Sequence, residues 1–174
     1  MKWAILAAGL LVLAALAVAA VGAMLPVKHR ASRRARFRQT PQAIYAVVAG
    51  PPDWRPEVKA TGPLPDANGR RRWWEQDSHG EKITYELVES SSPARFVTRI
   101  ADEKLPFGGT WTIEIEPVSA GESEVRVTED GEVYNMIFRF VSRFILGYYG
   151  SIESYLQNLG AKFGEQAVIE ATKP

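Results

Sequence analysis

The stretch GGTWTIEIEP, residues 108–117, alternates apolar and polar side chains between two glycines and a proline. Successive side chains of a strand point to opposite faces, so Trp111, Ile113 and Ile115 share one face. The stretch therefore predicts a strand with one apolar face. That face requires a second apolar layer to cover it.

Five further stretches have the composition of strands, namely residues 57–61, 70–77, 81–89, 94–101 and 123–129. Short, turn-like sequences such as DSHG and SAGE join several of them. Strands joined by short links pair side by side, so we expect an antiparallel meander.

Two elements are expected before this meander. Residues 33–38 predict a short strand. Thr40-Pro41 predicts the start of a short helix that runs to Gly50, because threonine is a good N-cap and proline is tolerated in a first turn.

The C-terminal third has a different period. From Asn135 on, apolar residues recur every three or four positions, which predicts one long amphipathic helix. They are Phe140, Phe144, Tyr148, Ile152, Leu156, Leu159 and Phe163. Gly147 and Gly150 weaken this helix, each by up to about 1 kcal/mol relative to alanine. We expect its apolar stripe to cover the apolar face of the strand at 108–117.

Residues 3–25 form a run of 23 residues without a charge, and about 20 suffice to span a bilayer core. This predicts a single-pass transmembrane anchor. The alternative is a cleaved signal peptide, because Val21-Gly22-Ala23 resembles a cleavage site. Basic residues follow the run at Lys28, Arg30, Arg33, Arg34, Arg36 and Arg38, which places the domain on the cytoplasmic side. Alternatively, some of these arginines belong to the first strand.

Composition limits the possible chemistry. The chain is 46% hydrophobic and 24% charged, with net charge +1, which favours a globular domain without nucleic acid as its partner. It has no cysteine and only two histidines. His29 falls in the expected linker and His79 in a hairpin turn, so neither is expected to act as a general base. We expect no catalytic residue, no metal site and no cofactor.

The order of elements resembles the SRPBCC superfamily, whose helix-grip fold includes START proteins and pollen allergens. The closer likeness is to polyketide cyclase/dehydrase-type bacterial members. TPQAIYAVV with PDWRP, WWEQ, LPFGGTWTIEIEP, VTEDGEVYN and FRFVSRF carry the resemblance. It implies an α+β fold in which a curved antiparallel sheet wraps around a long C-terminal helix. We expect an anchor at 1–27, the domain at 28–166 and a tail at 167–174.

The resemblance also implies a hydrophobic cavity between sheet and helix. The residues predicted to line it and bind a ligand are Tyr85, Phe96, Trp111, Ile113, Glu129, Phe140, Phe144 and Tyr148. The apolar members of this set are equally consistent with a filled core. Glu129 shares a strand face with Val125 and Val127, so parity points it inward. A bulge could instead turn it to solvent, or it could pair with Arg139 or Arg143.

Three functions remain open at this point. The first is a membrane-tethered module that binds a lipophilic small molecule. The second is a cyclase or dehydratase that uses Glu129 or Tyr85 as acid or base. The third is a protein-interaction module with a closed core. The sequence predicts neither the ligand nor the oligomeric state.

Overall fold

The computed structural model describes residues 2–172 of the 174-residue chain. Its helices are α1 (Lys2–Met24), α2 (Pro41–Val48), α3 (Met136–Val141) and α4 (Gly150–Lys162), with a 3-10 turn η1 (Pro52–Trp54) and a π-helical turn η2 (Ser142–Leu146). Its strands are β1 (Lys28–Phe37), β2 (Ala60–Ala67), β3 (Arg70–Gln76), β4 (Lys82–Ser91), β5 (Arg95–Ile100), β6 (Phe107–Ser119), β7 (Glu122–Val133) and β8 (Ile169–Ala171).

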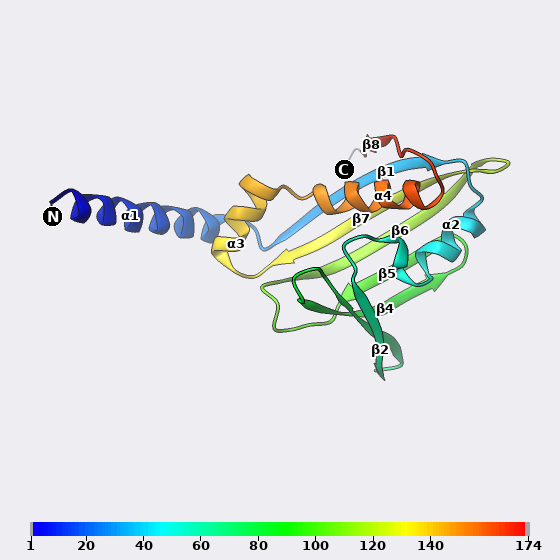
Figure 1. Cartoon of the computed structure of the whole chain (residues 1–174), viewed down its shortest axis with the longest axis horizontal. Coiled ribbons are helices and arrows are strands. Elements are labelled where there is room, and N and C mark those ends of the chain that lie inside the picture. The colour runs from blue at the N-terminus through cyan, green and yellow to red at the C-terminus, as the bar shows by residue number, and fades with distance from the viewer. Residues whose placement is uncertain (1, 173–174) are drawn as a thin grey trace.

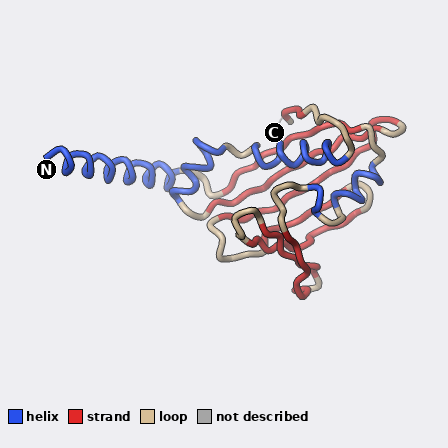
Figure 2. Tube along the Cα trace, in the orientation of Figure 1, coloured by secondary structure: helices blue, strands red, loops and turns tan. Residues whose placement is uncertain are grey.

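One antiparallel sheet of 8 strands forms the body of the molecule, in the order β2-β3-β4-β5-β6-β7-β1-β8. Strands β2 to β7 pair consecutively, which confirms the predicted meander. Helix α4 lies over β1 and β7, and α2 lies over β5 and β6 (Figures 1 and 2). The sheet therefore curves around the helices on one face, which is the predicted α+β helix-grip arrangement.

The core lies between this face and the helices. Ile113 and Ile115 of β6 are buried there, and Trp111 packs against the same cluster, as the alternation predicts. The other core residues include Phe37, Ile44, Val125, Val127, Ile152, Leu156 and Leu159. Burying each large apolar side chain contributes about 1.5–3 kcal/mol, so this layer dominates the stability of the domain.

The predicted long C-terminal helix begins as expected but is not continuous. Asn135 caps α3 by accepting hydrogen bonds from the amides of Ile137 and Phe138. The chain then widens into η2 and stops at Gly147, whose φ of 74° and ψ of 172° suit glycine almost alone. Helix α4 starts only at Gly150. The predicted single apolar stripe is therefore divided into two segments.

β1 is longer than the strand predicted at 33–38, and this changes the role of the basic residues. Lys28, Arg30, Arg34 and Arg36 pair with carboxylates of the neighbouring strands, while Arg33 pairs with Glu153 of α4 at 2.8 Å. Most of the basic flank is therefore part of the sheet, which was the alternative interpretation of these arginines.

Two further boundaries differ from the prediction. β2 begins at Ala60, because the chain turns at Arg55, whose carbonyl accepts from the amide of Val58 at 3.0 Å. Residues 169–171, expected in a tail, form β8 beside β1, where Glu170 pairs with Arg34 at 2.8 Å. A strand of three residues gives too short a pattern to be recognised in the sequence.

The N-terminal helix α1 projects away from the sheet along the long axis of the molecule (Figure 1). Residues 6–24 form the one helix of the described chain that is long and apolar enough to cross a membrane by length and composition. The short helix α2 starts as predicted, with the Thr40 hydroxyl accepting from the amide of Ala43 at 3.3 Å and Pro41 in the first turn.

Candidate functional site

A cavity of about 900 Å³ lies between the sheet, α4, the α3–η2 region and the loop after α2. This volume is within the range of small-molecule sites, which are commonly 300–1,000 Å³. The space that the resemblance implies is therefore present, and the core of this domain is not closed.

Six of the eight predicted ligand-binding residues line the cavity, namely Tyr85, Phe96, Trp111, Ile113, Glu129 and Tyr148. Phe140 and Phe144 do not. Phe144 is 59% exposed and contacts Phe140, with ring centroids 4.9 Å apart. Because the helix is broken at Gly147, the apolar stripe of α4 does not continue into the preceding segment, where Phe138 and Ser142 face the cavity instead.

Aromatic rings supply much of the cavity wall. Tyr155 of α4 contacts two tryptophan rings edge-on, with centroid distances of 5.0 Å to Trp54 and 5.6 Å to Trp111. Trp73 stacks on Tyr85 at 5.7 Å. Rings held in these geometries give a preformed apolar surface for a flat or hydrophobic ligand.

One polar group of the cavity includes a histidine that the sequence patterns did not predict as a site residue. His29 lies in β1, not in a linker, and its Nε2 is 3.3 Å from Oε1 of Glu129. The two side chains are 11% and 20% exposed. The ring of His29 stacks on Tyr148, with centroids 3.9 Å apart and planes 12° apart. The hydroxyl of Ser151 donates to the other oxygen of Glu129 at 3.5 Å.

Parity along β1 could have identified this histidine. Ala31, Ala35 and Phe37 are buried on one face, and His29 follows the same alternation backwards. Glu129 points inward as its own parity predicts. It contacts His29 and Ser151, so the alternatives of a solvent-facing carboxylate or pairing with Arg139 or Arg143 are wrong.

A second polar group lies on β3, β4 and the η1 turn. Arg55 forms an ion pair with Glu75, and Glu75 also accepts from the indole of Trp73 at 3.0 Å. Burial alone would lower the pKa of Arg55, but the charge and hydrogen bond of Glu75 outweigh it and raise that pKa. Burial raises the pKa of Tyr85 and Tyr155 well above the usual value, so both phenols stay protonated and can donate a hydrogen bond.

The cavity thus combines aromatic walls with two polar groups, one around Glu129 and one around Glu75. Such a site can hold a largely apolar molecule and orient it through hydrogen bonds at two places. Among residues 2–172, no group of three or more histidine, aspartate or glutamate side chains is placed to hold a metal ion.

Solved structures with this architecture identify the fold. Norcoclaurine synthase from Thalictrum flavum is 12% identical, with 80% of this chain and 88% of that chain covered and a TM-score of 0.61. XoxI from Bacillus cereus is 16% identical over 79% and 96% of the two chains, with a TM-score of 0.58. The chain has the SRPBCC helix-grip fold.

A conserved protein from Geobacillus kaustophilus shares this SRPBCC fold, at 10% identity over 82% of this chain and 99% of that one, with a TM-score of 0.59. No protein-family model and no curated protein matches the sequence. Identities this low establish the fold alone, because SRPBCC proteins with different functions share one architecture.

Proposed function

We propose that the chain is a membrane-tethered SRPBCC module that binds a lipophilic small molecule in the cavity between its sheet and α4. The observation that carries the proposal is the cavity of about 900 Å³ with Trp54, Trp73, Trp111 and Tyr155 in its wall. Filling this space with protein side chains would have stabilised the fold, so leaving it open has a cost that a bound ligand offsets.

An aromatic ring in the ligand fits this wall. A norcoclaurine synthase structure of the same fold, 12% identical to this chain, is a complex with dopamine and hydroxybenzaldehyde. That likeness supports a ligand with a flat ring, oriented by the phenols of Tyr85 and Tyr155 or by Glu129. The membrane tether rests on the length and apolar composition of α1.

Ligand binding is tested by tryptophan emission of the purified full chain in detergent, titrated with fatty acids, sterols and aromatic polyketides. We expect at least one class to change the emission and Trp111→Phe to reduce the change. The matched control is Trp74→Phe, because Trp74 neighbours Trp73 on β3 but is not part of the cavity wall. Equal responses in both variants, or no response to any class, would contradict the proposal.

The His29–Glu129 contact favours a second candidate function, a dehydratase or cyclase that works by proton transfer. The carboxylate of Glu129 would take a proton from the carbon beside a carbonyl group. The electron pair of that C–H bond forms a C=C bond, and a neighbouring hydroxyl leaves as water with a proton from protonated His29. Proton transfer across the 3.3 Å contact then restores both residues.

Turnover assays on cyclic and aromatic polyketide-like substrates separate the two functions. If the chain is an enzyme, the Glu129→Gln variant loses turnover. This variant still binds ligand and unfolds at the same denaturant concentration as the wild type. If the chain is a binding module, neither the wild type nor Glu129→Gln shows turnover.

A further inference from the structure

Large apolar side chains gather on the surface of one short segment of the domain. The segment α3–η2, residues 136–146, exposes Met136, Ile137, Phe144, Ile145 and Leu146, with Ile145 69% exposed. Outside α1, most of the exposed large apolar side chains of residues 2–172 lie in this segment or directly beside it. A soluble surface seldom concentrates such side chains without a partner.

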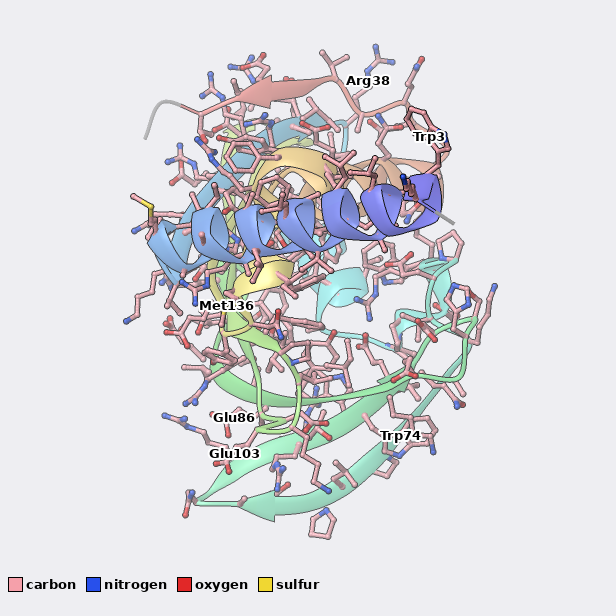
Figure 3. All side chains as sticks on the ribbon, turned by 90° about the vertical axis from the view of Figure 1, so that its left-hand side faces the viewer. Trp3, Arg38, Trp74, Glu86, Glu103 and Met136 are labelled. Carbon is pink, nitrogen blue, oxygen red and sulfur yellow. The ribbon has the colours of Figure 1, made fainter. Side chains whose placement is uncertain are left out.

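This segment packs against the end of α1. Gly22 is buried so tightly that a Cβ there would lie 1.9 Å from the carbonyl oxygen of Met136. The guanidinium of Arg139 donates to the carbonyl of Leu25 at 2.8 Å. Figure 3 shows Met136 next to the ribbon of α1, whereas Trp74 lies on strands far from it.

The contact extends inward along α1. Val18 and Ala19 are half-buried and Gly22 is buried, while the other described side chains from Leu6 to Met24 are exposed. These three positions lie on one face of the helix. At a rise of 1.5 Å per residue, the covered part extends about 9 Å back from Met24. If α1 crosses a bilayer, α3 therefore lies at the same depth as the last two turns of α1.

The opposite face of the segment belongs to the cavity. Phe138 and Ser142 line it from α3 and η2, and Gly147 and Tyr148 line it where η2 ends. The segment is thus a thin wall with an apolar outer surface and the cavity behind it.

We propose that the outer surface of α3–η2 is embedded in the lipid bilayer beside α1, so that the membrane covers one wall of the cavity. The inference rests on the proposed anchor. The exposed apolar side chains of α3–η2 lie next to the exposed apolar helix α1, because α3 packs on α1 at Gly22. Tyr134 and Tyr149 flank the segment as half-exposed rings, a residue type enriched at membrane interfaces. Arg143, exposed on the same segment, suits anionic lipid headgroups.

The absence of cysteine from the chain makes the test clean, because one introduced cysteine carries one label. The full chain is reconstituted in vesicles of phosphatidylcholine and phosphatidylglycerol, with an environment-sensitive fluorophore on Phe144→Cys or Ile145→Cys. Quenching by lipids that carry a bromine or nitroxide in the acyl chain is compared with quenching by aqueous iodide. Leu13→Cys, in the middle of α1, and Ser119→Cys, at the end of β6, are the controls.

We expect the labels at 144 and 145 to be quenched by the lipids, at a shallower depth than the label at 13, and to be protected from iodide. The label at 119 should show the reverse. If the labels at 144 and 145 behave like the one at 119 while the label at 13 is in the lipid, the proposal is wrong and this surface is left for a protein partner. If the label at 13 is also in water, the anchor itself is wrong.

Discussion

Gly131 lies directly opposite His29 in the β1–β7 pairing, and the histidine ring occupies the place of its missing side chain. A Cβ at this position would lie 2.2 Å from Cε1 of His29 and 2.9 Å from Oε1 of Glu129. The contact between histidine and carboxylate therefore depends on a glycine in the neighbouring strand.

Gly131→Ala should displace His29 from Glu129 and destabilise the domain by about 1–3 kcal/mol through overpacking. Denaturant unfolding in detergent measures the free energy of unfolding, with Gly150→Ala as the control, since no atom lies within 4 Å of a Cβ built there. A Gly131→Ala protein as stable as the wild type would contradict the tight packing of this pair.

Tyr155 gives a prediction about alkaline pH. Burial raises its pKa in the folded state above the value of about 10 for an exposed phenol. Above pH 10 the unfolded chain loses the phenol proton that the folded chain keeps, so the free energy of unfolding falls with pH, by up to about 1.4 kcal/mol per unit. Below pH 10 this phenol adds no pH dependence.

Tyr155→Phe should therefore flatten the loss of stability between pH 9.5 and 11.5. The measurement is the free energy of unfolding at each pH for both proteins. Parallel curves would show that the Tyr155 phenol titrates alike in folded and unfolded chains.

At the scale of elements, the break between η2 and α4 depends on two glycines with different roles. Gly147 has a φ of 74°, whereas Gly150 is the first residue of α4 and its φ is not positive. A Cβ would find open space at both positions, so the backbone conformation alone separates them.

Gly147→Ala should cost about 1–3 kcal/mol, because side chains other than glycine are strained in this region. Gly150→Ala should stabilise the protein by about 0.4–1 kcal/mol through the unfolded chain. Denaturant midpoints of the two variants, measured in one detergent, should shift in opposite directions. A shift of both in the same direction would mean that the break is not set by Gly147.

For the molecule as a whole, the predicted location of the domain rests on α1. Over most of the helix the described apolar side chains are exposed, and no other part of residues 2–172 covers them. In water, this surface would carry a large hydrophobic penalty.

We expect the full chain, with Met1 retained, to remain in the membrane fraction after a carbonate wash. Deletion of residues 2–24 should release the protein. Mature wild-type protein that starts near Met24 in a soluble fraction would identify the segment as a cleaved signal peptide instead.

Orientation needs a separate measurement. The basic residues after α1 place the domain on the cytoplasmic side if they act as topology signals before they pair in the sheet. A single cysteine at Ser119, the last residue of β6, should resist a membrane-impermeant thiol reagent in intact cells and react after lysis. Ready labelling of intact cells would place the domain outside.

Features encoded by a few consecutive residues could be predicted from the sequence. Alternation identified the apolar face of Trp111, Ile113 and Ile115, whereas for Glu129 it left an inward direction as one of several alternatives. Thr40-Pro41 marked the start of α2, and the uncharged run marked α1. Each of these depends on local geometry, because strand parity, helix capping and the length of an apolar run act within the segment itself.

The composition of the cavity wall, in contrast, depends on contacts between segments that are far apart in the sequence. The 3.3 Å contact of His29 with Glu129 joins residues 100 positions apart, and no local pattern connects them. Phe138 and Ser142 line the cavity in place of Phe140 and Phe144, because the break at Gly147 separates this segment from the apolar stripe of α4. Whether the cavity stays open depends on how far the sheet curves away from α4. That curvature results from packing contacts between segments that are distant in the sequence.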